Sequence, residues 1–107
     1  MICDAAALLS FFDRDAAGHW AVTGEIELAA ESEPLVVSPF AVAELEQTVL
    51  AAYGNDGWLA ILEELGGGAW TIAIVDWEHL AQLSPLCRTG VSLAAASTSV
   101  LRAHHGS

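Results

Sequence analysis

The sequence predicts an α/β fold in which a small parallel sheet is flanked by helices. Three short apolar segments suit buried strands, one ending at Cys3, one at 35–37 and one at 70–75. Helical patterns follow each of them, and helical connections favour parallel strands joined by right-handed crossovers. No linker or change of composition divides the 107 residues, so we expect a single domain over 1–107 with a modest core.

The first strand runs into Asp4, which stands at the turn into a helix predicted over 5–12. A second helix is predicted over 19–30, and a loop around Pro34 leads from it into the strand at 35–37. We expect the first strand to be the central one, with Cys3 buried in it.

Ser38 and Pro39 predict the start of a third helix, because serine is a favoured N-cap and proline suits the first helical position. This helix is expected to reach Tyr53, where the glycine-rich segment 54–57 breaks it. Another helix follows over 58–65. One face of it is expected to carry Leu59, Leu62 and Leu65.

The segment 70–75 is rich in β-branched and aromatic residues and predicts the third strand. Asp76 is expected to cap a helix that runs through Leu83, and Gly90 separates it from a last helix over 92–103. The predicted order is strand, helix, helix, repeated three times.

Two carboxylates have a setting that suggests a site. Asp4 ends the first strand, and Glu44 lies between one and two turns into the helix that follows the second strand. Because parallel strands present their carboxyl ends at one sheet edge, Asp4 and Glu44 are expected to converge there. The alternatives are that Asp4 only caps its helix and that Glu44 is an ordinary exposed helix residue.

These segments resemble the PIN-domain ribonucleases, specifically the VapC-type toxins of bacterial toxin-antitoxin pairs. Members begin with a hydrophobic strand, an Asp and a short Leu-rich helix, which correspond here to Ile2-Cys3-Asp4 and Ala7-Leu8-Leu9. Members also carry a later Ser-Pro-x-x-x-x-Glu-Leu segment, which corresponds to 38–45.

The resemblance implies a PIN-like, three-layer α/β/α fold and a metal-dependent endoribonuclease that hydrolyses RNA phosphodiester bonds. Asp4 and Glu44 would be its catalytic and metal-binding residues, and Mg²⁺ or Mn²⁺ its cofactor. The resemblance also implies an antitoxin-type protein partner and an RNA substrate.

The chain departs from this family pattern at two places. Ala95 stands where members carry a third acid, and the sequence ends at Ser107, before the strand and acidic turn that would follow. We therefore expect a C-terminally shortened fold and weak or impaired activity. The alternative is a catalytically inactive PIN-like binding module that associates with an antitoxin-type partner or with itself. A third acid beside Asp4 and Glu44 would favour the enzyme, and the candidates are Asp13, Asp15 and Asp76.

The charge balance limits the ways in which this chain can hold RNA. The formal net charge is -11, with 14 acidic residues against 3 arginines and no lysine. Arg14, Arg88 and Arg102 are too few and too scattered to form the basic stripe that binds phosphates. Tight RNA binding by this chain alone is not expected, whereas steering favours a basic protein partner.

The remaining features predict location and assembly. No apolar run approaches the ~20 residues needed to cross a bilayer, and no basic signal region opens the sequence, so a cytoplasmic protein without a membrane partner is expected. The high apolar content predicts a homodimer. Both cysteines, Cys3 and Cys87, are expected to be small buried residues, not a disulfide. We expect His79, His104 and His105 to be structural, and the tryptophans to pack in the core or an interface. The tryptophans are Trp20, Trp58, Trp70 and Trp77.

Overall fold

A computed structural model describes residues 1–105, so the expectation about the end of the chain and the side chain of His105 lie outside it. Within this range, three parallel strands form one sheet in the order β1, β2, β3. The strands are β1 (Ile2–Cys3), β2 (Leu35–Val37) and β3 (Trp70–Ile72). Cys3 lies opposite Val37, which lies opposite Ile72, so the three strands end at the same level.

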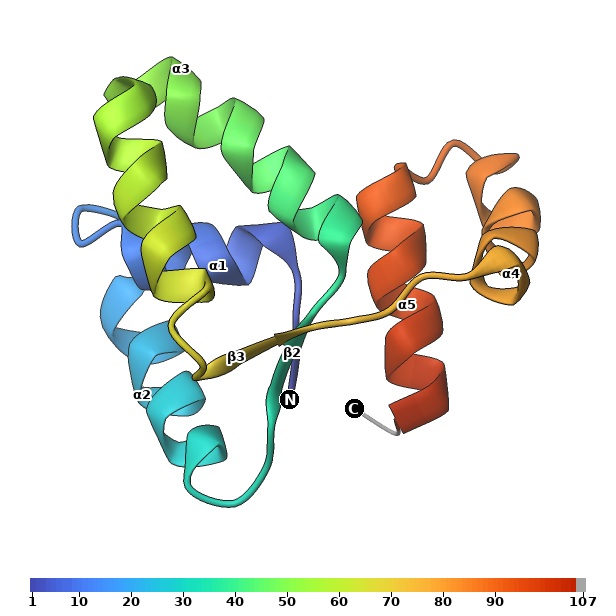
Figure 1. The fold of residues 1–107 in the computed structure, drawn as a ribbon, viewed down its shortest axis with the longest axis horizontal. Coiled ribbons are helices and arrows are strands. Elements are labelled where there is room, and N and C mark those ends of the chain that lie inside the picture. The colour runs from blue at the N-terminus through green and yellow to red at the C-terminus, as the bar shows by residue number, and fades with distance from the viewer. Residues whose placement is uncertain (106–107) are drawn as a thin grey trace.

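The helices lie on both sides of this sheet, as Figure 1 shows. They are α1 (Ala5–Phe12), α2 (His19–Ala30), α3 (Pro39–Leu65), α4 (Trp77–Cys87) and α5 (Leu93–His105). In Figure 1, α1, α2 and α3 lie to one side of the strands, whereas α4 and α5 lie to the other. The predicted α/β class and the alternating order of elements are confirmed. No helix of the described residues is long and apolar enough to cross a membrane.

A side-chain cap starts each helix that directly follows a strand. Asp4 Oδ1 accepts a hydrogen bond of 2.7 Å from the Ala7 N–H, and Ser38 Oγ accepts one of 3.1 Å from the Phe40 N–H in the first turn of its helix. Asp76 Oδ1 does the same for the His79 N–H at 3.0 Å. These bonds satisfy helix N–H groups that have no partner within the helix. The predicted caps at Ser38 and Asp76 are thus confirmed, and Asp4 also caps its helix, which the sequence indicated as the alternative to a role in a site.

The main core lies between the sheet and the first three helices. It contains Cys3, Leu8, Ile26, Leu35, Val37, Ala41, Leu45, Val49, Trp58, Leu65 and Trp70. A smaller core joins α4 to α5 and contains Leu83, Ala96 and Val100, with Phe40 packed against it. The two cores lie on opposite sides of the strands, as the three-layer prediction requires.

A buried hydrogen-bond network joins the two layers of helices. The Ser97 hydroxyl of α5 lies 2.6 Å from the Ser38 hydroxyl and 2.7 Å from Nε2 of His79 in α4. All three side chains are buried. In a low dielectric such a network is rigid, because each lost bond leaves an unpaired polar group. The structural interpretation of His79 is confirmed.

Some details of the sequence interpretation are wrong. The strand β1 is an edge strand of the described sheet, so Cys3 is buried but not central. Cys87 is exposed at the end of α4. The third strand stops at Ile72, three residues before the predicted end.

The buried face of the segment after the helix break also differs from the prediction. Leu59 and Leu62 are each 44% exposed, whereas Trp58 and Leu65 are buried and Ile61 packs against the same core. Gly54, at φ 75° and ψ -171°, redirects the chain inside α3, and this kink sets which face of the following turns meets the core.

The four tryptophans divide into two pairs. Trp58 and Trp70 belong to the core, and the ring of Trp70 meets Phe11 edge-on at 5.7 Å between centroids. Trp20 and Trp77 are 78% and 74% exposed. Core packing is confirmed for the first pair, and an interface role for the second stays a prediction.

Replacing Gly54 with alanine should destabilise the domain. A residue with a Cβ is strained at φ 75°, ψ -171°, at a cost of about 1–3 kcal/mol. Nothing lies within 4 Å of the added Cβ, so the loss would report backbone strain alone. Urea unfolding measures it.

The matched control is Gly24→Ala in α2, where the backbone is helical and the Cβ also meets nothing within 4 Å. It should stabilise the protein by about 1 kcal/mol, the propensity difference between glycine and alanine in a helix. Equal stability of the two variants would show that Gly54 does not fix the kink.

Candidate functional site

Asp4 lies where β1 ends and α1 begins, and its two carboxylate oxygens face different partners. Oδ1 accepts the capping hydrogen bond from Ala7, whereas Oδ2 lies 3.8 Å from Nη2 of Arg102. The side chain is 42% exposed. One oxygen therefore holds the helix start, and the other remains available to a cation in the site.

Glu44 lies on the second turn of α3, which begins directly after β2. Its neighbour Leu45 is fully buried, whereas Glu44 is exposed at the border of the apolar face. Because β1 and β2 are adjacent and end together, the helices that follow them bring Asp4 and Glu44 to one place.

That place is a pocket of about 250 Å³ at the carboxyl ends of the strands. It is lined by Asp4, Ala5, Ala6, Glu44, Ser92, Ala94, Ala95, Thr98 and Arg102. We refer to it below as the two-acid pocket. The predicted convergence of Asp4 and Glu44 is thus present in the structure, and their role in metal binding stays a prediction.

The three other acids considered as a third ligand do not line this pocket. Asp13 lies at the far end of α1, where its carboxylate accepts a 2.6 Å hydrogen bond from the Tyr53 hydroxyl. This bond lowers the pKa of Asp13 and raises that of Tyr53. The carboxylate of Asp76 caps α4. Asp15 lies beside Asp13, because its N–H donates a hydrogen bond to the Asp13 carboxylate. Among residues 1–105, no three His, Cys, Asp or Glu side chains gather as a metal cluster.

One face of α5 forms the wall opposite the two acids. Ala95, Thr98 and Arg102 are three and four residues apart, which places them on the same side of a helix. The sequence comparison put Ala95 in the site by resemblance. Thr98 and Arg102 were missed, although continuing the helical spacing from Ala95 would have found both.

Thr98 has an unsatisfied polar atom at this wall. Its side chain is 2% exposed, and Oγ1 makes no hydrogen bond within the part of the chain that the structure describes. A buried hydroxyl without a partner is unfavourable by about 1–3 kcal/mol.

The donor set fits a small divalent cation. Magnesium prefers oxygen ligands, keeps several of its waters and is commonly held by one or two carboxylates. The two-acid pocket offers those two carboxylates. Arg102 is the one feature of the pocket that opposes a metal ion, because it carries positive charge.

A larger pocket of about 600 Å³ lies between α2 and the last turns of α3. Aromatic side chains form much of its wall, and two carboxylates and one guanidinium lie on it as well. The aromatic residues are Phe11, Phe12 and Trp20, and the charged ones are Glu27, Glu64 and Arg14. Because the carboxylates outnumber the guanidinium, this apolar hollow suits a basic, amphipathic partner better than a phosphate backbone.

No family model matches the chain. Ribonuclease VapC26 of Mycobacterium tuberculosis (strain ATCC 25618 / H37Rv) is 48% identical to it over 73 residues. The matched segment covers 68% of this chain and 53% of that protein, so the match spans about half the length of this curated relative.

Placing an acid at position 95 should strengthen cation binding. Ala95 is exposed and lines the two-acid pocket near the start of α5, where the helix dipole favours negative charge. Ala95→Asp should tighten Mn²⁺ binding about 10- to 100-fold, the range that supporting groups reach in metal sites. Calorimetric titration with Mn²⁺ measures the change.

Ser99→Asp is the matched control, because Ser99 is exposed on the same helix and does not line the pocket. It adds the same charge and should leave the affinity almost unchanged. If Ala95→Asp melts at a lower temperature and Mn²⁺ does not restore it, position 95 does not belong to a metal site.

Proposed function

We propose, from the premise that this chain belongs to the VapC family of PIN-domain proteins, that it is a metal-dependent endoribonuclease of low activity. It would hydrolyse RNA phosphodiester bonds at the two-acid pocket. The observation that supports this most directly is the convergence of Asp4 and Glu44 at the ends of two adjacent parallel strands.

The chemistry needs one Mg²⁺ or Mn²⁺, which when bound lowers the pKa of a water ligand and polarises a phosphate oxygen. Asp4 and Glu44 would hold the ion. The capping bond to Ala7 fixes the orientation of the Asp4 carboxylate, so that Oδ2 is presented at a defined position. A ligand held in this way loses little side-chain freedom when the ion binds.

Two features support low activity. A two-metal clamp requires more carboxylates than the two that the pocket offers. The net charge of -11 also disfavours approach of the RNA backbone to the free chain. Binding of substrate would then depend on the metal ion and the few contacts around it.

A second candidate function is a binding module without catalysis, and the two-acid composition of the pocket favours it. In either case the proposed protein partner is antitoxin-like and basic. An apolar anchor of the partner would enter the larger pocket between α2 and α3, and its Arg or Lys side chains would meet Glu27 and Glu64. We place both the partner and the RNA in the cytoplasm.

We also propose a homodimer. Large apolar side chains are exposed from the third strand into the fourth helix, and Ile74 and Trp77 are 92% and 74% exposed. Ile72 and Leu80, at 42% and 49%, extend this run at either end. Exposed apolar side chains at this density are a common feature of protein interfaces.

Cation binding should depend on Asp4 and Glu44. Asp4→Asn keeps a side chain that caps a helix as well as aspartate does but removes the charge, and Glu44→Gln does the same for the other acid. Each should weaken Mn²⁺ binding at least tenfold and lower any RNA cleavage with it. Calorimetry gives the affinity, and gel analysis of a labelled RNA gives the cleavage.

The control is Asp76→Asn, which makes the same exchange at the cap of α4, outside the two-acid pocket. Its Mn²⁺ affinity should equal that of the wild type. Unchanged Mn²⁺ binding in Asp4→Asn would end the metal-site interpretation.

The homodimer can be tested with two exposed tryptophans. Trp77→Arg should convert the dimer to a monomer at tens of micromolar, whereas Trp20→Arg, equally exposed but on the wall of the larger pocket, should not. Light scattering after size exclusion measures the mass. A wild-type chain that is monomeric at this concentration would contradict the proposal.

A further inference from the structure

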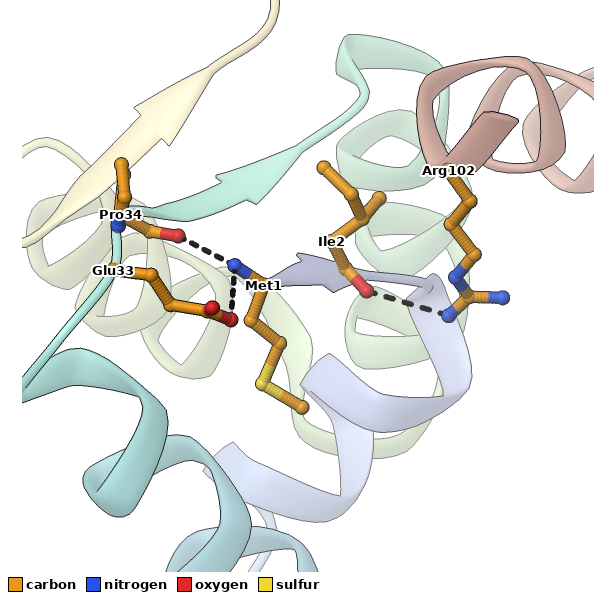
Figure 2. A network of polar contacts seen from close by, with 5 residues as sticks. All are labelled: Met1, Ile2, Glu33, Pro34 and Arg102. Carbon is orange, nitrogen blue, oxygen red and sulfur yellow. Dashed lines mark hydrogen bonds and ion pairs between the residues drawn. The ribbon is translucent and has the colours of Figure 1, made fainter. Parts of the chain in front are cut away.

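Arg102 is the cation of the two-acid pocket in this structure. It extends from α5 toward the end of β1, and its Nη2 donates a 3.3 Å hydrogen bond to the carbonyl oxygen of Ile2. Figure 2 shows the guanidinium beside that carbonyl, at the point where β1 passes into α1. The same nitrogen lies 3.8 Å from Asp4 Oδ2. The other two arginines, Arg14 and Arg88, do not line this pocket.

The two oxygens of Asp4 limit what a metal ion could use. Oδ1 already accepts the Ala7 N–H, whereas Oδ2 accepts no hydrogen bond among the described residues, so Oδ2 is the more open position for a cation. Oδ2 is also the oxygen that faces Arg102. A divalent cation and the guanidinium would therefore compete for the same atom.

We propose that Arg102 is a built-in counterion of the two-acid pocket, and that a divalent cation binds there only when the guanidinium moves away from Asp4. This role rests on the proposed function, since it concerns the same site. With Arg102 in place the pocket carries one net negative charge from two acids and one arginine, and without it two.

Electrostatics sets the size of this competition. A guanidinium keeps its proton at any physiological pH, so the opposing charge is permanent. Both side chains of the ion pair are nearly half exposed, at 45% for Arg102 and 42% for Asp4, and solvent weakens such a pair. Arg102 should therefore lower the affinity for the ion by about tenfold and not prevent binding altogether.

The competing interpretation gives Arg102 a structural role only. Its hydrogen bond to Ile2 connects α5 to the edge strand β1, and these two elements are in contact. In that case losing Arg102 would lower the melting temperature without changing the affinity for a metal ion. Only the counterion role predicts that removing the charge of Arg102 changes the affinity for a metal ion.

The experiment is calorimetric Mn²⁺ titration of the full chain and three variants, with melting temperatures measured with and without Mn²⁺. Arg102→Gln should bind Mn²⁺ about tenfold more tightly than the wild type. Arg102→Lys retains the charge and should stay within about threefold of the wild type. Arg88→Gln removes the same charge outside the pocket and should have no effect on the affinity.

The possible outcomes separate this inference from the proposed function. If the wild type binds Mn²⁺ and Arg102→Gln binds it no more tightly, the proposed role of Arg102 is overturned, whereas the metal site is still supported. An equal gain in Arg102→Lys would also overturn it, because charge would not be the cause. If neither the wild type nor Arg102→Gln binds Mn²⁺, the proposed metal site fails and this role fails with it. Mn²⁺ binding by Arg102→Gln but not by the wild type would support both the metal site and the role of Arg102.

Discussion

The geometry of the pocket depends on one buried hydroxyl, that of Ser97. It joins Ser38, where β2 passes into α3, to His79 in α4, so that one side chain of α5 is tied to two other elements. The small core of Leu83, Ala96 and Val100 would hold α5 near α4 by itself, but apolar contacts are not directional. The hydrogen bonds fix the rotation of α5, and this rotation turns Ala95, Thr98 and Arg102 toward the two acids.

The pocket combines the carboxylates of a metal site with an arginine that partly neutralises their charge. Two carboxylates at the ends of adjacent strands favour a cation. Arg102 offsets part of that negative charge. Any activity of the chain would therefore be set by the balance of three charges and not by one catalytic group.

The sequence predicted most features that local chemistry decides. Caps at Ser38 and Asp76 require only a suitable side chain before a helix, and the meeting of Asp4 with Glu44 follows from parallel strands. The exposed faces after Gly54 could not be predicted, because the angle of the kink decides which side of the helix meets the core. Arg102 could have been placed in the pocket from its helical spacing to Ala95. Its hydrogen bond to Ile2, 100 residues away in the chain, has no local signal in the sequence.

The two acids do not support a metal site equally. Asp4 would be expected at its position for a structural reason alone, since it caps α1, and so its presence says little about cations. Glu44 has no such reason: among the described residues its carboxylate takes part in no hydrogen bond or ion pair. An exposed glutamate is common on a helix, but one that lines a pocket with a second acid is harder to explain by solvation alone. The functional interpretation therefore depends more on Glu44 than on Asp4.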